Sequence, residues 1–183
     1  MLPITIPAEE GWDAKRRVFV TVRNEMTIYL EHSLDSVSKW ESTWNKPFLS
    51  KDDKTDEETL DYIKCMTITP DVPKEIYDYI ASNKQIVDKI HKYINAPMTA
   101  TTFSKDQKGK PKRQVITSEI IYYWMVTFNI PSEFQYWHLN RLITLIRVCS
   151  IKSAKPEKRS AKETMSYNKA LNAARQKKFN TRG

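Results

Sequence analysis

The feature that most constrains the fold of this chain is the apolar stretch from Ile116 to Lys152, ITSEIIYYWMVTFNIPSEFQYWHLNRLITLIRVCSIK. Its apolar residues predict two helices with a break at Pro131, because proline cannot continue a helix. Thr117 and Ser118 can cap the first helix. Asn129 can end it, since asparagine tolerates the left-handed conformation that often follows a helix. We therefore expect an αα-hairpin at the centre of a hydrophobic core.

The two helices of this αα-hairpin are expected to differ in their surroundings. The first has almost no polar face, so the sequence predicts that it is buried nearly all round. The second is expected to start at Ser132, because Gln135 three residues later has the spacing of a capping box. Arg141 and Arg147 are expected to point outward from it. A pair of helices this apolar indicates a structural core rather than an active site.

Helix signals also appear in other parts of the chain. Apolar residues at helical spacing follow the potential caps Ser33 and Thr55. Pro73 suits the first turn of a further helix, and Asn83 can both end that helix and cap the next one. The segment from Ala161 to Lys178 has high helix propensity but few apolar residues, so this last helix is marginal on its own.

Two segments rich in β-branched residues lie near the N-terminus. They run from Val18 to Val22 and from Met26 to Leu30, and they flank Arg23-Asn24-Glu25. This spacing predicts a β-hairpin with a three-residue loop. Before it, Leu2 to Pro7 is predicted as a short extended arm and Gly11-Trp12-Asp13 as a turn.

A second extended element is predicted in the middle of the chain. Met98 to Phe103 and Gln114 to Ile116 bracket the segment SKDQKGKPKR, which favours a hairpin or an extended flap. Its tip is either a solvated loop or a contact for an anionic partner, through Lys105, Lys108, Lys110, Lys112 and Arg113. The predicted fold class is α+β, mostly α, with a small N-terminal β-hairpin packed on a bundle of about six helices and a basic C-terminal helical tail.

The positive charge of the chain is concentrated towards its C-terminus. The formal net charge is +8, yet residues 1–151 carry 20 Lys and Arg against 20 Asp and Glu. Residues 152–183 carry 10 Lys and Arg against Glu157 and Glu163, so they hold the whole excess. This asymmetry predicts a single mostly helical globular domain at 1–151 and a basic C-terminal arm at 152–183.

Residues that could carry catalysis or bind a metal are scattered along the sequence. His32, His91 and His138 have no Cys or carboxylate at metal-ligand spacing, and no glycine motif for phosphate binding occurs. His138, between Trp137 and Leu139, is expected to be a hydrogen-bonded core histidine. The acidic run KDDKTDEE lacks the Gly and the bidentate Glu of a calcium loop. We therefore predict no enzyme activity, no metal and no cofactor.

Cellular location is also predicted from the sequence. Cys65 and Cys149 lie in apolar helical patterns and are expected to be buried free thiols. The N-terminus has neither the basic nor the apolar region of a signal peptide. The longest apolar run, from Ile120 to Ile130, is much shorter than the roughly 20 residues that a membrane span requires. These features predict a soluble, cytoplasmic protein that has no membrane partner.

Binding to another macromolecule is the function class that composition favours. Trp40 and Trp44 share one helix face, where they either contact the hairpin or form a partner-binding stripe. Basic arms bind nucleic acid by neutralising phosphates, but this arm has only Tyr167 and Phe179 to stack on bases. Docking of a protein by the arm and binding of nucleic acid both stay open. The candidate partner-binding residues are Trp40, Trp44, Tyr122, Tyr123, Trp137, Arg159, Lys162, Arg175, Lys177 and Lys178.

Several stretches resemble a group of bacteriophage proteins. In chain order they are IPAEEGWD, LEHSLDSVSKWESTWNKPFLS, YIKCMTIT, NAPMTATTF, EIIYYWM, WHLNRLITLIRVCSIK and NKALNAARQKKFNTRG. Together they cover most of the chain, and they resemble proteins of long-tailed phages of the kind assigned as tail assembly chaperones. No catalytic residue follows from this resemblance, because the family has none.

The resemblance implies a non-enzymatic role in tail morphogenesis. A tail assembly chaperone binds the long helical tape-measure protein, shields its apolar stripes and helps tail-tube subunits assemble around it. A neutral helical body with exposed aromatic residues and a basic arm is compatible with such a role. Two alternatives remain, a structural protein of the virion tail or connector and a basic nucleic-acid-binding protein. The oligomeric state is not predicted.

Overall fold

The computed structural model describes residues 1–103, 115–154 and 161–180. The chain divides into two compact units, Met1–Ser150 and Ile151–Gly183. The described residues form helices and small antiparallel β-pairs, so the predicted α+β, mostly α fold class is confirmed. Some of the predicted basic contact residues lie outside the described residues. They are Lys105, Lys108, Lys110, Lys112 and Arg113 of the central segment, and Arg159 of the arm.

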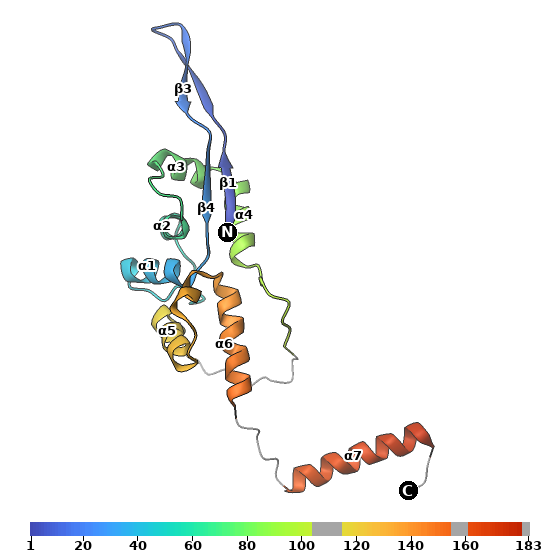
Figure 1. Ribbon diagram of the computed structural model, residues 1–183. Coiled ribbons are helices and arrows are strands. Elements are labelled where there is room, and N and C mark those ends of the chain that lie inside the picture. Colours follow the sequence, from blue (N-terminus) through green and yellow to red (C-terminus); the bar gives the residue numbers. More distant parts are fainter. Residues whose placement is uncertain (104–114, 155–160, 181–183) are drawn as a thin grey trace. The chain divides into compact units, whose positions relative to one another are not determined.

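A two-stranded ribbon begins the first unit (Figure 1). β1 (Leu2–Ile6) pairs antiparallel with β4 (Met26–Leu30), and β2 (Glu9–Asp13) pairs antiparallel with β3 (Val18–Arg23). The ribbon therefore runs out along β1 and β2, turns at residues 14–17, and returns along β3 and β4.

This arrangement corrects the predicted hairpin. The two strands from the prediction exist, but β3 does not pair with β4, and residues 24–25 only link successive strands of one ribbon leg. Gly11-Trp12-Asp13 is part of strand β2 rather than a turn, and the predicted N-terminal arm is strand β1. The turn of the ribbon instead lies at residues 14–17, where Arg17 takes a left-handed conformation with φ of 51°.

The base of the ribbon belongs to the hydrophobic core. On β1 and β4, buried Ile4, Ile6, Ile28 and Leu30 alternate with exposed residues, as expected for strands with one covered face. Helix α4 (Lys84–Ile94) packs against β1 and contributes the buried Ile90. The remaining core side chains come from helices of the first unit, mainly as Leu34, Val37, Trp40, Tyr62, Ile63, Met66, Ile76, Ile80, Ile121, Met125, Leu139, Leu142 and Ile146.

Local capping signals set the starts of the first four helices. α1 (Leu34–Trp44) and α2 (Asp56–Met66) begin with reciprocal capping boxes at Ser33 and Thr55. α3 (Lys74–Ser82) starts directly after Pro73. Asn83 ends α3, and its side chain accepts backbone N–H bonds in the first turn of α4. These four helices match the predicted ones.

The apolar stretch that was expected to form an αα-hairpin is interrupted differently. α5 (Ser118–Thr127) is followed by the left-handed Asn129 and then by the short 3₁₀ helix η2 (Ser132–Tyr136). α6 (Leu139–Ser153) starts only after η2, so the predicted capping box at Ser132 does not begin it. α5 packs mainly on α1, which leaves Tyr123 and Val126 exposed and corrects the predicted burial all round.

Two other predictions are tested by the structure. The described parts of the central segment, residues 98–103 and 115–116, form no strand, so no paired hairpin is seen there, and the alternative of an extended flap stays a prediction. Cys65 and Cys149 are free thiols as predicted, but both are half-buried rather than buried. Within the described residues, no helix combines the length and the apolar character that a membrane crossing requires.

The second unit contains helix α7 (Ala161–Phe179), close to the predicted bounds. Nearly all of its described side chains are exposed, including Met165 and Phe179, and Leu171 is half-buried. The low apolar content of this segment therefore yields a helix without a buried face of its own.

Candidate functional site

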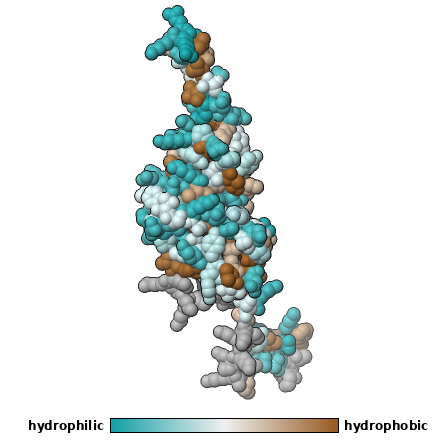
Figure 2. All heavy atoms as spheres, turned by 60° about the vertical axis from the view of Figure 1, so that its left-hand side comes forward, coloured by the Kyte–Doolittle hydropathy of each residue, from teal (hydrophilic) through white to brown (hydrophobic). Residues whose placement is uncertain are grey.

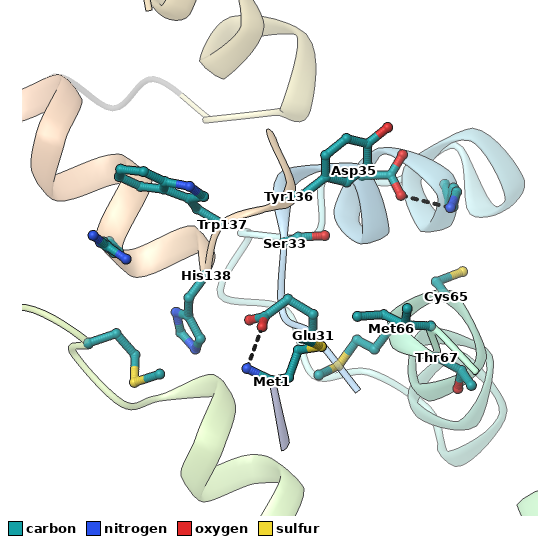
Figure 3. A pocket seen from close by; sticks show the side chains of 14 residues that line it. Met1, Glu31, Ser33, Asp35, Cys65, Met66, Thr67, Tyr136, Trp137 and His138 are labelled. Atoms are coloured by element: carbon teal, nitrogen blue, oxygen red, sulfur yellow. Dashed lines mark ion pairs between the residues drawn. The ribbon is translucent and has the colours of Figure 1, made fainter. Parts of the chain in front are cut away.

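A cleft of about 680 Å³ lies in the first unit (Figure 3). It lies where the end of β4, the start of α1, the end of α2 and the η2–α6 junction meet. These segments are far apart in the sequence, so the pattern of residues along the chain does not reveal it. Its lining consists of Met1, Glu31, Ser33, Asp35, Lys39, Cys65, Met66, Thr67, Ile68, Met98, Tyr136, Trp137, His138 and Arg141.

An aromatic wall forms one side of the cleft. Trp137 stacks on Phe134 with ring centroids 4.0 Å apart. The guanidinium of Arg141 lies over the Trp137 ring at 4.0 Å, in cation–π geometry. Tyr136, which is 60% exposed, points away from Trp137 and lies beside Asp35 (Figure 3). The wall therefore combines rigid aromatic surface with a cation that has no ion pair among the described residues.

The acidic side chains of the cleft are already engaged. Glu31 accepts a hydrogen bond from the Tyr93 hydroxyl at 2.7 Å and pairs with the Met1 ammonium at 2.6 Å. Asp35 pairs with Lys39 at 2.7 Å. Figure 3 shows both ion pairs as dashed lines. Neither carboxylate is a free general base, and the cleft keeps Arg141 as its uncompensated charge.

Two histidines, which in the sequence stand apart, come together beside the cleft. The rings of His32 and His138 are 5.1 Å apart, because Ser33 and His138 form an isolated β-bridge. The Leu139 N–H also donates to the His32 carbonyl at 2.7 Å. The two rings meet through a long-range contact between the β4–α1 link and the η2–α6 junction, which the separation of the histidines in the sequence does not reveal.

Both histidines are held in the neutral form. Burial lowers the pKa of His32 to about 3, with a further contribution from the charge of His138. Burial also lowers the pKa of His138. The Nε2 of His138 lies 3.1 Å from the Tyr93 carbonyl, and its Nδ1 accepts the Asn140 N–H at 3.3 Å. His138 is thus a hydrogen-bonded core histidine, as predicted.

The thiol in the cleft is a poor nucleophile. Burial raises the pKa of Cys65 to about 11, so the thiol keeps its proton at neutral pH. No group of three or more His, Cys, Asp or Glu side chains in the described residues is arranged to hold a metal ion. The cleft does gather acidic, thiol and imidazole groups, but it pairs no free base with an activated nucleophile. Its geometry suits binding of side chains better than proton transfer.

The aromatic residues predicted to bind a partner differ in their burial and in their hydrogen bonds. Trp40 is buried, and its indole N–H donates to the Glu58 carbonyl at 2.9 Å, so it is a core residue and not a contact for a partner. Trp44 is half-buried and donates to Asp61 at 3.0 Å. The two tryptophans do share a face, but they pack between α1 and α2 rather than against the ribbon.

Residues of the later helices are more accessible. Tyr122 is half-buried and donates to Gln135 at 2.9 Å, whereas Tyr123 is 66% exposed. Trp137 lines the cleft. On α7, the exposed predicted residues are Arg175, Lys177 and Lys178, while Arg159 and the side chain of Lys162 lie outside the described residues.

The outer half of the ribbon carries apolar side chains that sequence analysis missed as a functional candidate. Trp12 and Phe19 form a cross-strand pair with ring centroids 5.1 Å apart, and both are exposed. Val18, Val20 and Val22 are exposed as well. Figure 2 shows hydrophobic surface on this ribbon below its hydrophilic tip. The signal for it was the uncharged run VFVTV, which was assigned instead to a covered hairpin.

No protein family, curated protein or solved structure matches this chain. The likeness to tail assembly chaperones therefore stays a prediction. The function of the chain is inferred from the geometry of its own residues together with that likeness.

Proposed function

We propose that this chain is a non-enzymatic protein that binds a helical protein partner in the cleft beside Tyr136, Trp137 and Arg141. In its specific form, the proposal is a bacteriophage tail assembly chaperone that acts in the host cytoplasm. It binds the tape-measure protein and helps tail-tube subunits assemble.

The observation that supports this proposal is the pairing and protonation of the side chains that line the cleft. The acidic side chains are paired within the chain, the imidazole is neutral and hydrogen-bonded, and the thiol is protonated. What stays accessible is the Tyr136 ring, together with the Trp137 ring and the Arg141 guanidinium stacked over it. Such a surface suits the apolar face of an amphipathic helix that carries an acidic residue beside it.

The tape-measure protein is supported as the partner by the resemblance described above. That protein is long and helical, and its apolar stripes need cover before the tail tube encloses them. A cleft with rigid aromatic anchors is the kind of surface where a few residues supply most of the binding energy. The specific assignment to tail assembly depends on this resemblance and on no other feature of the chain.

The test is capture of the tape-measure protein encoded with this chain, after co-expression. The wild-type chain is expected to retain it, and Tyr136→Lys is expected to weaken retention at least tenfold, the loss of roughly 1.4 kcal/mol or more that one aromatic anchor supplies. Tyr29→Lys is the matched control, because Tyr29 is exposed but does not line the cleft.

Two results would contradict the proposal. Equal retention by both Tyr→Lys variants would exclude the cleft as the binding site. Stoichiometric presence of the chain in purified virions would instead support a structural protein of the tail or connector.

The exposed basic residues of α7 favour a second candidate, a nucleic-acid-binding role for the second unit. Arg175, Lys177 and Lys178 are all exposed at the end of this helix. Cations so placed bind phosphates in a strongly salt-dependent way. Removal of the second unit tests this candidate, because the shortened chain should then lose salt-dependent binding of nucleic acid.

A further inference from the structure

The outer ribbon has apolar side chains on both of its faces. In an antiparallel pair, residues directly opposite one another share a face, and neighbours along a strand point to opposite faces. The observed register places Trp12 opposite Phe19 on one face and Val18 and Val20 on the other, and Val22 lies on the face of Val20, against Gly11. Phe19 is 70% and Val22 65% exposed. The stability of a two-stranded ribbon with both faces exposed is marginal. A further strand or layer would therefore stabilise it by covering its apolar side chains.

The two edges of the ribbon differ in how well they are protected against pairing. The β2 edge carries the charged residues Glu9, Glu10 and Asp13, and the register shift between Glu9 and Glu10 leaves Val22 of β3 as the extra residue of a bulge. Charged side chains keep edge strands from pairing with other chains, and it is in these charges that the two edges differ. Residues 18–22 of β3, VFVTV, contain no charge and no proline. The β3 edge is therefore the one open to another strand.

The ends of the β3 edge carry opposite charges. At the turn, Lys15, Arg16 and Arg17 are exposed. At the base, Arg23 stacks over the Tyr79 ring at 4.1 Å, so α3 lies beside the end of β3. α3 also bears the exposed acidic residues Glu75 and Asp78, against one exposed basic residue, Lys74.

This charge pattern is self-complementary. If β3 pairs antiparallel with β3 of a second copy, the basic turn of each copy lies beside the partner copy's α3 and its acidic side chains. Arg23, which such pairing brings near the turn, is already compensated by Glu9 at 3.0 Å. Two copies related by a twofold axis make this contact twice with the same residues, which is the usual arrangement in homodimers.

We propose that the chain forms a homodimer through antiparallel pairing of β3 with β3 of a second copy, across a twofold axis near Val20. The product is a four-stranded sheet in the order β2-β3-β3-β2. In this register Val18 lies opposite Val22 of the second copy, and Phe19 lies opposite Thr21. These cross-strand pairs cover part of both apolar faces and supply the stabilising contacts.

The register allows a test by charge pairing at one pair of positions. In V18K/V22K, each lysine lies opposite a lysine of the second copy, and like charges directly opposite destabilise a sheet. In V18E/V22K, each glutamate lies opposite a lysine. We expect the wild-type full chain to show twice its 21.5 kDa mass by light scattering or sedimentation. V18K/V22K should associate at least tenfold more weakly, and V18E/V22K should recover most of that loss.

Circular dichroism and thermal melting of each variant exclude simple unfolding as the cause. A monomeric wild-type chain at all concentrations would overturn the proposal. Dimerisation of V18K/V22K as tight as that of the wild type would overturn it too, and so would equal weakening in both folded variants.

A second measurement avoids charged substitutions altogether. Val20→Cys places one thiol near the twofold axis, and mild oxidation should yield a disulfide-linked dimer on a non-reducing gel. Val126→Cys is the matched control, because this valine is exposed on α5 away from the ribbon. Equal cross-linking of the two variants would contradict pairing at β3.

Discussion

At the scale of single residues, Glu41 joins three parts of the first unit. Its Oε1 accepts the Phe48 N–H at 2.8 Å, and its Oε2 accepts the Ser118 N–H at 2.7 Å. The second bond places a carboxylate at the N-terminus of α5, where the helix dipole favours negative charge. This side chain replaces the predicted cap, since Thr117 makes no side-chain capping bond.

Removal of this carboxylate should destabilise the fold. Glu41→Ala leaves two buried backbone N–H groups without partners, which costs about 3 kcal/mol in unfolding free energy. Glu41→Gln keeps one acceptor oxygen and should cost roughly half as much. Urea unfolding measures both values. Glu25→Gln, at an exposed position between β3 and β4, should stay within about 0.5 kcal/mol of the wild type. Equal stability of Glu41→Gln and Glu25→Gln would contradict the role given to Glu41.

His32 should make stability depend on pH. Burial lowers its pKa in the folded chain to about 3 from 6.5. Below pH 6.5 the unfolded chain binds a proton that the folded chain does not, so unfolding free energy falls as pH drops from 6.5 towards 3. The slope is at most about 1.4 kcal/mol per pH unit for this one group.

The variant His32→Asn removes this titration. The Asn side chain, which has both a donor and an acceptor, can replace Nδ1 in the hydrogen bond to the Tyr62 hydroxyl, 2.5 Å away. Urea unfolding between pH 6.5 and 5 should therefore give a flatter profile than the wild type, while His91→Asn, at an exposed position, should keep the wild-type slope. An unchanged slope in His32→Asn would show that another group carries the dependence.

At the scale of secondary-structure elements, the sequence predicts correctly those elements that are set by interactions between residues close together in the chain. It fails where the interacting residues are far apart in the chain. Ser33, Thr55 and Asn83 cap helices through bonds to residues two or three positions away, so the local sequence predicts these starts. Strand pairing is not local. The ribbon turns at residues 14–17, which lack glycine and asparagine, while Gly11 gave a false turn signal.

Gly11 has a different role, which only the structure shows. A Cβ atom at this position would lie 2.7 Å from a methyl group of Val22, so the absence of a side chain lets the two strands pack closely. The burial of α5 was likewise overestimated. Composition shows that this helix is apolar, but not that it packs on one side only and turns Tyr123 outward.

At the scale of the whole molecule, the charge and the hydrophobic core belong to different parts of the chain. Every buried core residue of the described chain lies in the unit Met1–Ser150, whereas residues 152–183 hold the excess of positive charge. The cleft could not be predicted at this scale, because Glu31, Cys65 and Tyr136 come from three distant segments. Only the cluster of Tyr136, Trp137 and His138 was visible in the sequence.

A chain that ends at Ser153, the last residue of α6, tests this division. We expect its free energy of unfolding to stay within about 1 kcal/mol of the full chain, because the core is retained. If the second unit binds nucleic acid, the full chain should bind it in a salt-dependent way and the shortened chain should not. Equal binding by both chains would place the nucleic-acid contact elsewhere.

The bond between the His32 carbonyl and the Leu139 N–H also bears on how the protein is made. Its two partners come from opposite halves of the sequence, so a ribosome must synthesise almost the entire first unit before they can meet. At usual translation speeds, that delay is on the order of 10 s. During this interval the nascent chain holds His32 and Ser33 without Leu139 and His138, and α1 without α5 and η2, which makes this the stage at which the growing polypeptide most needs protection.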